Sequence, residues 1–317
     1  MNQLGYTVGG LLYTPATNSE IAAHIMHGDW EHLTSVSLCL EDSIQDAGLM
    51  DAEAQLKRTL RRLRQCEKPL PKLFVRVRNP EHLLHVQQFL DEETSLLSGY
   101  IFPKFDLDNA VQYLDTLRRI NAARPDARLY AMPILESRMI ADIRTRRDAL
   151  FQLRRIVDDR QDDILNIRVG GNDFCNRFGL RRSVRQTIYD IGVVRDILMD
   201  ILNVFSDDYV VSGPVWEYYG QSTGDAWALG LRRELELDRA NGFFGKTAIH
   251  PSQLPLIHES MQVTRADYED AVQILSWSDP VRAVQGSRQG RMNEQKCHTK
   301  WAERIKLRAE FYGIREE

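Results

Sequence analysis

The sequence contains no Cys-x-x-Cys pair, no long apolar run and no basic residue near its start. Its four cysteines, Cys39, Cys66, Cys175 and Cys297, stand far apart. This spacing matches neither a disulfide framework nor a zinc site, so we expect reduced thiols. No apolar stretch approaches the roughly 18 residues of a membrane-spanning helix. The first basic side chain is Lys57, so the basic region of a secretory signal is missing and we expect a cytoplasmic protein without membrane association.

An excess of positive charge is also absent. The chain has 41 Lys and Arg against 45 Asp and Glu, for a net charge of -4. Such a balance gives no general attraction to a phosphate backbone or an anionic membrane, which argues against nucleic-acid binding. With 43% hydrophobic and 27% charged residues, the composition is that of an ordinary globular protein and excludes a disordered or fibrous chain.

No Ser/Gly-rich or Pro-rich linker divides the first 260 residues. Instead, short apolar or β-branched segments alternate with longer segments of helical period. The strand cores are expected at residues 11–14, 36–40, 73–77, 100–103, 129–135, 165–169, 209–211 and 243–249. Eight such repeats with nearly continuous apolar strands favour a parallel (β/α)8 barrel, a TIM barrel, over a doubly wound open sheet.

The residues after the eighth strand have a different pattern. Two helical stretches, at 265–276 and 294–312, flank the segment VRAVQGSRQGRMN, which has no apolar period and is expected to be a mobile connection. We therefore predict a barrel domain over residues 1–260 and a C-terminal helical extension with a lid segment over residues 261–317.

Polar side chains follow the predicted strands where the apolar runs end. In a parallel barrel these ends meet on one face, which carries the active site. The candidates are Glu41, Asp42, Arg76, Arg78, Lys104, Asp106, Glu136, Asn172, Asp173, Trp216, Glu217, Lys246 and His250. Each alone is more simply a solvated loop residue or a helix cap, but so many acids and bases at one opening indicate a functional site.

Two carboxylates stand out in this set. Glu136 ends the apolar run PILE, and Asp173 follows the pair of glycines in GGNDF. Mg²⁺ takes oxygen ligands, keeps several waters and needs only one or two protein carboxylates, so these two residues fit a magnesium site. The structural alternatives are an N-cap region for Glu136 and an Asx-turn for Asp173.

These segments together resemble a known family. The motifs LCLEDS, VRV, FPK, PILE, GNDF and GFFGKTAIHP, followed by Gly290-Arg291-Met292, are similar in order and spacing to the HpcH/HpaI aldolase and citrate lyase β-subunit (CitE-like) family. The resemblance covers roughly residues 10 to 310. It implies a TIM barrel of the phosphoenolpyruvate/pyruvate-domain type, a homo-oligomer, and Mg²⁺ held by Glu136 and Asp173.

The same resemblance implies a carbon–carbon lyase or aldolase that acts on a small 2-oxo or hydroxy carboxylate through a metal-stabilised enolate. Arg76 would stabilise the enolate oxygen together with the metal. Glu41 and Asp42 would hold metal-bound waters, or one of them would move a proton. Arg78, Lys104 and His250 are the further candidates for substrate binding.

Three departures from the family pattern bear on the substrate. Cys39 stands where the family often has Asp, the segment Thr14 to Asn18 lacks the basic residue that helps bind the acyl carrier, and Gln289 replaces the acid of the family's lid motif. The last two argue against a CoA ester, which the family otherwise uses. The departures at Cys39 and Gln289 leave open a second hypothesis, a catalytically silent member that serves in a biosynthetic or stress-response assembly.

Two further readings fit the residues less well. The sequence Gly245-Lys246-Thr247 resembles the end of a P-loop, but Ala240 stands where the first glycine should be. A P-loop must also open a helix, whereas this segment is expected to continue as a strand that stops at Pro251. A transferase that uses pyruvate or phosphoenolpyruvate on the same barrel would need a Gly-rich phosphate loop, and none stands out. We therefore expect a small-carboxylate substrate.

Overall fold

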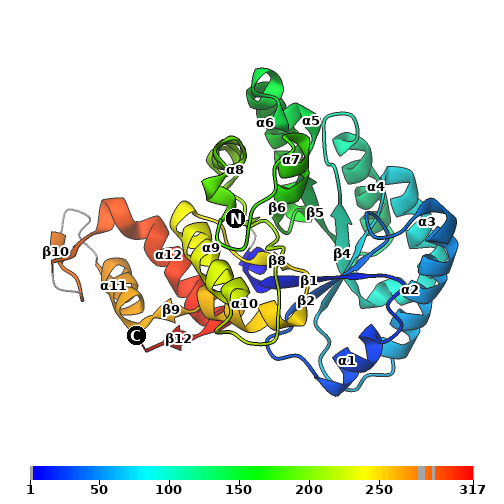
Figure 1. Ribbon diagram of the computed structural model, residues 1–317, viewed down its shortest axis with the longest axis horizontal. Helices are drawn as coiled ribbons and strands as arrows, with labels where there is room; N and C mark the ends of the chain where they lie inside the picture. The colour runs from blue at the N-terminus through cyan, green and yellow to red at the C-terminus, as the bar shows by residue number, and fades with distance from the viewer. Residues whose placement is uncertain (1–2, 278–282, 288–289, 317) are drawn as a thin grey trace. The chain divides into compact units, whose positions relative to one another are not determined.

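The computed structural model describes residues 3–277, 283–287 and 290–316. The chain forms two compact units, Met1–Ile257 and His258–Glu317 (Figure 1). Among the described residues, no helix is long and apolar enough to cross a membrane.

The first unit is built on a parallel sheet of eight strands in the order β7-β6-β5-β4-β3-β2-β1-β8. The strands are β1 Gly10–Pro15, β2 Ser35–Cys39, β3 Lys72–Arg76, β4 Leu97–Phe102, β5 Tyr130–Leu135, β6 Ile167–Val169, β7 Val211–Ser212 and β8 Lys246–Ala248. A parallel bridge between Gly213 and Lys246 joins the two edges of the sheet. The predicted TIM barrel is therefore confirmed, and each predicted strand core overlaps an observed strand.

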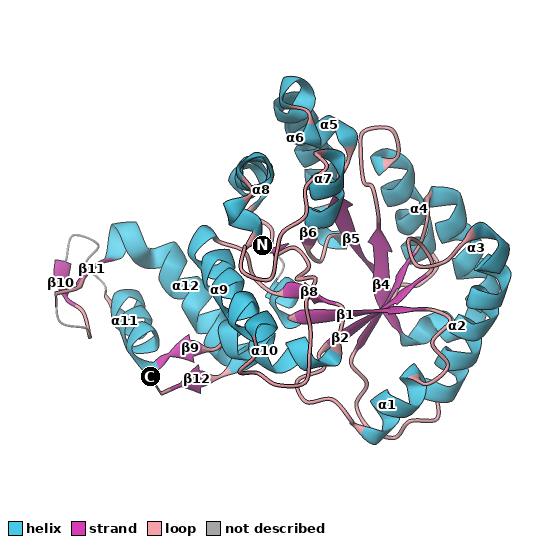
Figure 2. Cartoon of the chain, in the orientation of Figure 1, coloured by secondary structure: helices cyan, strands magenta, loops and turns pink. Residues whose placement is uncertain are grey.

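Helices follow the strands and surround them (Figure 2). They are α1 Ile21–His27, α2 Leu49–Leu63, α3 Pro80–Leu90, α4 Ala110–Ala122, α5 Arg138–Ala141, α6 Ile143–Asp158, α7 Gly171–Arg177, α8 Gly192–Phe205, α9 Ala226–Asn241 and α10 Leu254–Met261. Short 3-10 helices lie at Gln3–Thr7, Asp46–Gly48, Asp91–Leu96, Gln161–Asp163, Ile188–Asp190 and Pro251–Gln253. The helical run expected over 137–160 is split, because Asp142 is extended and its carboxylate accepts the backbone N–H of Arg144 at 3.0 Å, which starts α6.

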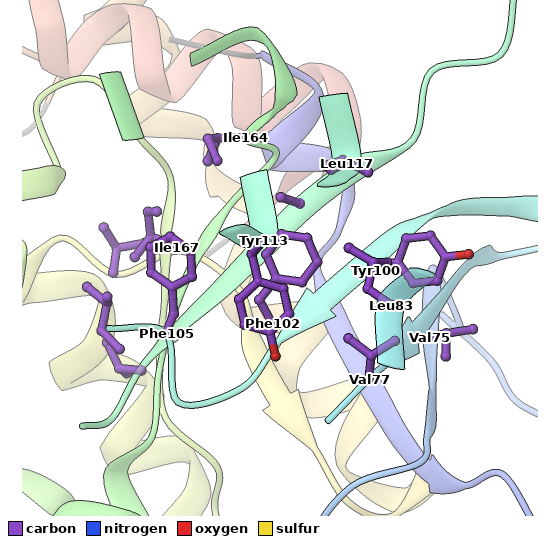
Figure 3. Packing of buried hydrophobic residues seen from close by; sticks show 14 of the residues in the cluster. Val75, Val77, Leu83, Tyr100, Phe102, Phe105, Tyr113, Leu117, Ile164 and Ile167 are labelled. Carbon is purple, nitrogen blue, oxygen red and sulfur yellow. The ribbon is translucent and has the colours of Figure 1, made fainter. Parts of the chain in front are cut away.

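The main hydrophobic core lies between the strands and the helices. On α2, Leu56, Leu60 and Leu63 recur at intervals of three and four and are fully buried. Figure 3 shows Tyr113 of α4 packed on Phe102 at the end of β4, with the two ring centroids 4.3 Å apart. Burial of this surface fixes the helical layer and with it the direction of the strands.

A second cluster fills the barrel interior and decides which side chains reach the active face. Side chains alternate along a strand. On β3 the outward Val75 joins the outer core, whereas Phe74 joins the inner cluster with Leu11, Ile101 and Met132. Residues two positions further along, such as Arg76, therefore point into the barrel above this apolar floor.

The second unit consists of β9 Val263–Thr264, α11 Arg265–Ser276, β10 Ala283–Gln285, β11 Met292–Glu294, α12 Gln295–Tyr312 and β12 Ile314–Arg315. Its core is made by side chains of α11 and α12 together with Val263. The connection expected to be mobile contains an antiparallel pair, in which Val284 lies opposite Asn293. Residues 281–282 and 288–289 of this connection lie outside the described residues, and its mobility stays a prediction. The lid role of residues 261–317 stays a prediction.

Candidate active site

A cavity of about 430 Å³ opens where the barrel strands end. Charged and polar side chains from seven strands or the loops that follow them line it. They include Tyr13, Asp42, Arg76, Glu136, Arg168, Asn172, Asp173, Arg181, Glu217 and Thr247. The structure thus brings six of the predicted candidates to one cavity, namely Asp42, Arg76, Glu136, Asn172, Asp173 and Glu217.

The carboxylates of Glu136 and Asp173 form the acidic part of this cavity. Burial, and next the negative charge of Asp173, raise the pKa of Glu136 to about 8. Asp173 lies in the first turn of α7 and forms no ion pair with any residue that the structure describes. Two neighbouring carboxylates without a shared cationic side chain attract a cation.

The backbone around Glu136 is shaped to hold its carboxylate. Oε1 accepts the backbone N–H of Lys104 at 2.9 Å, and Lys104 takes the left-handed conformation with φ of 49° that directs this N–H. A Cβ atom on Gly170 would lie only 2.1 Å from Oε2 of Glu136. Glycine is therefore required at position 170. Glu136 lies directly before Ser137, the N-cap of α5, and it is Ser137 whose side chain caps the helix.

Arg76 lines the same cavity and is buried. Its Nη2 atom contacts the carboxylates of both Glu41 and Asp42. Lys104 binds the same two carboxylates, with its ammonium 3.3 Å from Asp42. The guanidinium also lies 5.6 Å from the centre of the Tyr13 ring. Glu41 itself does not line the cavity, so it acts on the site through Arg76 and Lys104.

Three members of the predicted ring lie elsewhere. Arg78 donates from Nε to the Leu40 carbonyl at 2.8 Å and from Nη1 to Asp46, which ties down the loop after β2. His250 stacks on Tyr219 with ring centroids 4.5 Å apart, and its Nδ1 caps the next 3-10 turn. Trp216 is fully buried, and its Nε1 donates to the Trp227 carbonyl at 3.0 Å. None of the three lines the cavity.

Lys246 does not line the cavity either, because its side chain points out of the barrel into a buried ionic network. Its Nζ lies 2.9 Å from Glu234 and 2.7 Å from Asp238 on α9, and Arg182 donates to Glu234 at 2.8 Å. Burial raises the pKa of Asp238, and the charge of Lys246 opposes this. The lysine of the Gly-Lys-Thr sequence therefore holds α9 against β8 rather than binding a phosphate.

We expect Lys246→Met to lower the free energy of unfolding by about 3–5 kcal/mol, because it leaves the buried Asp238 without its cation and removes one of the two cations that bind Glu234. The matched control is Arg239→Met on the same helix, where the arginine is exposed. Urea unfolding followed by circular dichroism measures both. A loss below about 1 kcal/mol for Lys246→Met would contradict the structural role of the network.

Four lining residues were missed by the sequence reasoning, namely Tyr13, Arg168, Arg181 and Thr247. The sequence could have indicated Arg168, because a charged residue inside the apolar strand 165–169 is unusual. Tyr13 and Thr247 belong to the strand bodies, and only the inward direction of alternate residues would have selected them. Arg181 comes from a loop with no pattern to mark it. Gln289, whose replacement of an acid was noted above, lies outside the described residues.

Within residues 3–277, 283–287 and 290–316, no three His, Cys, Asp or Glu side chains form a group that could hold a metal. The acidic pair of Glu136 and Asp173 is therefore the candidate for a cation that keeps water ligands. This feature excludes a closed zinc site of four protein ligands in that region.

A parallel (β/α)8 barrel with acidic and guanidinium side chains at the carboxyl ends of its strands has the architecture of a TIM-barrel enzyme. The family described as C–C bond lyase of the TIM-barrel fold matches residues 2–314, and the chain belongs to this family. The resemblance inferred from the sequence is thus confirmed. A search of curated proteins found no match.

Solved structures share the fold at low sequence identity. The CitE protein of Mycobacterium tuberculosis, in complex with magnesium, acetoacetate and coenzyme A, is 20% identical with a TM-score of 0.61, covering 95% of this chain and 98% of that one. A citrate lyase of Burkholderia xenovorans is 13% identical with a TM-score of 0.69, over 98% and 93% of the two chains. A citrate lyase β subunit of M. tuberculosis with oxaloacetate and magnesium is 20% identical with a TM-score of 0.50, over 82% and 99%.

Proposed function

We propose that this protein is a Mg²⁺-dependent carbon–carbon lyase that acts on a small 2-oxo or hydroxy carboxylate. The observation that carries the proposal is the pair of Glu136 and Asp173, which line the same cavity as Arg76. Membership of a family of carbon–carbon bond lyases supports the reaction class. The substrate class is supported by the small carboxylates, oxaloacetate and acetoacetate, in complexes of two structural relatives.

The acidic pair fits Mg²⁺ on chemical grounds. Mg²⁺ prefers oxygen ligands and binds through one or two carboxylates while it keeps water and substrate oxygens. Burial and the charge of Asp173 raise the pKa of Glu136, so a cation bound beside both carboxylates would stabilise their ionised forms. When bound, Mg²⁺ supplies Lewis-acid polarisation of the substrate oxygens.

Arg76 would bind the substrate carboxylate or stabilise the negative charge that develops on oxygen as the carbon–carbon bond breaks. Glu41 and Asp42 hold its guanidinium in one orientation, so little reorganisation is needed during the reaction. In the cleavage direction a base takes the hydroxyl proton and an acid protonates the released carbon. Asp42 is the candidate for this proton transfer, because it lines the cavity whereas Glu41 does not.

We also propose that the substrate carries no CoA. The loop after β1 has no basic residue, and the Asn18 side chain donates to Thr14 Oγ1 at 3.0 Å, so the loop makes hydrogen bonds within itself. Replacement of an acid by Gln289 removes a group that a CoA-ester lyase of this family uses. Hydrolytic or lyase activity on citryl-, malyl- or citramalyl-CoA should therefore be weak, and Gln289→Asp should raise any residual activity.

The experiment that tests the function is a panel of 2-oxo acids, hydroxy acids and CoA esters, assayed with and without Mg²⁺ for turnover and for thermal stabilisation. We expect Mg²⁺-dependent cleavage of a small carboxylate. Robust turnover of a CoA ester would overturn the proposal about the acyl carrier. Absence of any Mg²⁺-dependent binding would overturn the proposed function.

The silent-subunit hypothesis is the second candidate, and it rests on Cys39. This residue is buried at the end of β2, where its Sγ accepts the backbone N–H of Glu41 at 3.4 Å, so one acid of the family pattern is absent. Cys39→Asp separates the two candidates. Activity that appears only in this variant would favour a silent subunit, whereas Mg²⁺-dependent turnover by the wild type favours the lyase. A homo-oligomer is a further proposal, which light scattering tests.

A further inference from the structure

Arg168 lies inside the barrel beneath the proposed metal site, and it is only 1% exposed. It stands on β6 with Ile134 of β5 and Ser212 of β7 as its strand neighbours. Its outward neighbours Ile167 and Val169 belong to the outer core. The guanidinium therefore belongs to the interior and contributes to the lining of the cavity.

The guanidinium of Arg168 is surrounded by neutral hydrogen-bond partners. Nη2 donates to Thr247 Oγ1 at 2.6 Å, and Nη1 lies 3.5 Å from Asn166 Oδ1. Nε has no hydrogen-bond partner. Tyr13 lies close enough to interact with Arg168, but burial raises the pKa of this phenol, so it carries no charge at neutral pH. No carboxylate in the described part of the chain forms an ion pair with Arg168.

A buried arginine without an acidic partner is unusual. Arginine stays protonated in proteins, so it cannot escape the cost of burial by losing its proton. Buried charges are normally paired, and an unpaired one costs several kcal/mol. An anionic ligand that enters the cavity would supply the missing partner.

The other cations of the cavity are already neutralised. Arg76 contacts Glu41 and Asp42, and Arg181 lies 3.4 Å from Glu217. Among the cations that line the cavity in the described residues, Arg168 is thus the one without a carboxylate. A divalent cation between Glu136 and Asp173 would balance those two acids and leave the positive charge of Arg168 unmatched.

The strand register places the backbone of Arg168 deeper in the barrel than the backbone of Glu136. Arg168 pairs with Ile134 of β5, and Glu136 comes two residues later, just after the end of this strand. At a rise of about 3.3 Å per residue, the backbone of Arg168 lies about 7 Å below that of Glu136. A dicarboxylate held at the metal by one carboxylate would extend its second carboxylate toward Arg168, which lines the same cavity.

We propose that Arg168 binds a second acidic group of the substrate, so that the site selects a dicarboxylate over a monocarboxylate of the same length. This inference rests on the proposed function for the position of the first carboxylate. The guanidinium supplies charge and two parallel donors, which suit a carboxylate. Thr247 and Tyr13 orient the guanidinium.

The test compares two hydroxy acids of four carbons, L-malate and 2-hydroxybutyrate, which differ in the second carboxylate. Calorimetry at saturating Mg²⁺ measures both affinities. We expect the wild type to bind L-malate about 10- to 100-fold tighter, the range for a hydrogen bond to a charged group. Arg168→Gln should abolish this preference and leave the affinity for 2-hydroxybutyrate within about threefold. An equal loss of affinity for both acids in Arg168→Gln, or an unchanged preference for L-malate, would overturn the proposal.

Two further variants test whether the loss of preference comes from the missing Arg168 guanidinium. Arg168→Lys keeps the charge without the two parallel donors, and it should reduce the preference to an intermediate value. Circular dichroism shows whether Arg168→Gln folds, and if it does not, Arg168→Lys replaces it in the test. An unchanged preference for L-malate in Arg168→Lys would then overturn the proposal. Arg181→Gln is the matched control, because it removes a guanidinium from the same cavity that is already paired with Glu217. This control should keep the preference.

Failure of this inference and failure of the proposed function give different results. If Mg²⁺ binds and the wild type does not distinguish the two acids, the role of Arg168 is wrong and the metal-dependent function stands. If the preference depends on Arg168 and Mg²⁺ has no effect on binding, the role of Arg168 stands and the metal-dependent function is wrong.

Discussion

Glu136→Gln and Asp173→Asn should each lower Mg²⁺-dependent turnover by at least about 10³-fold. Each amide keeps the size of the side chain but removes one of two negative charges that would hold the cation. A metal ion stabilises charge in a transition state by several kcal/mol, and each 1.36 kcal/mol corresponds to a factor of ten in rate. Steady-state kinetics with varied Mg²⁺ gives the loss, and calorimetry without substrate gives the change in Mg²⁺ affinity.

The same variants should fold without difficulty. Burial and the neighbouring charge of Asp173 disfavour the ionised form of Glu136, so the neutral amide of Glu136→Gln should leave the metal-free protein at least as stable as the wild type. Asp108→Asn is the control, because Asp108 is exposed on the loop after β4 and does not line the cavity. Turnover of Glu136→Gln within about threefold of the wild type would contradict the proposed metal site.

Arg76→Lys should lower kcat by about 10²- to 10³-fold, the cost of removing one preorganised donor from a developing negative charge. The guanidinium contacts Glu41 and Asp42 and faces the cavity at the same time. Lysine offers a single point of charge and cannot keep the planar arrangement of donors. Because the loss would arise in the transition state, kcat should fall more than KM rises.

Arg78→Lys is the matched control for Arg76→Lys. Its guanidinium binds the Leu40 carbonyl and Asp46 in the loop after β2, so this change should lower the melting temperature and leave kcat within about threefold. If Arg76→Lys has the kinetics of the wild type while Arg78→Lys does not, the assignment of the two arginines is wrong.

The strand pattern explains how much of the molecule could be predicted from the sequence. The apolar runs around Val75 and Ile134 gave the barrel strands, because burial on both faces leaves a nearly continuous apolar signal. The ends of the same runs indicated Arg76, Glu136 and Asp173, since parallel strands deliver their last residues to one face. These residues do lie at one cavity, whereas their chemical roles stay predictions.

The strand pattern does not predict which individual side chains point into the barrel. Lys246 and Thr247 are neighbours on β8, and one points into a network with Glu234 while the other lines the cavity. Which of two neighbours faces inward depends on the register with β1 and β7, which is a long-range property. His250 shows the same limit, because the turn after β8 directs it onto Tyr219 instead of into the cavity.

A cation shared by Glu136 and Asp173 is the central feature of the proposed active site. A crystal structure of the protein soaked with Mn²⁺ in place of Mg²⁺, with anomalous scattering to locate the ion, tests it directly. We predict one ion bonded to a carboxylate oxygen of each residue, at about the 2.0–2.2 Å typical of small hard divalent cations, with water completing its coordination. An ion elsewhere in the barrel, or both carboxylates pointing away from any ion at saturating Mn²⁺, would contradict the proposed metal site.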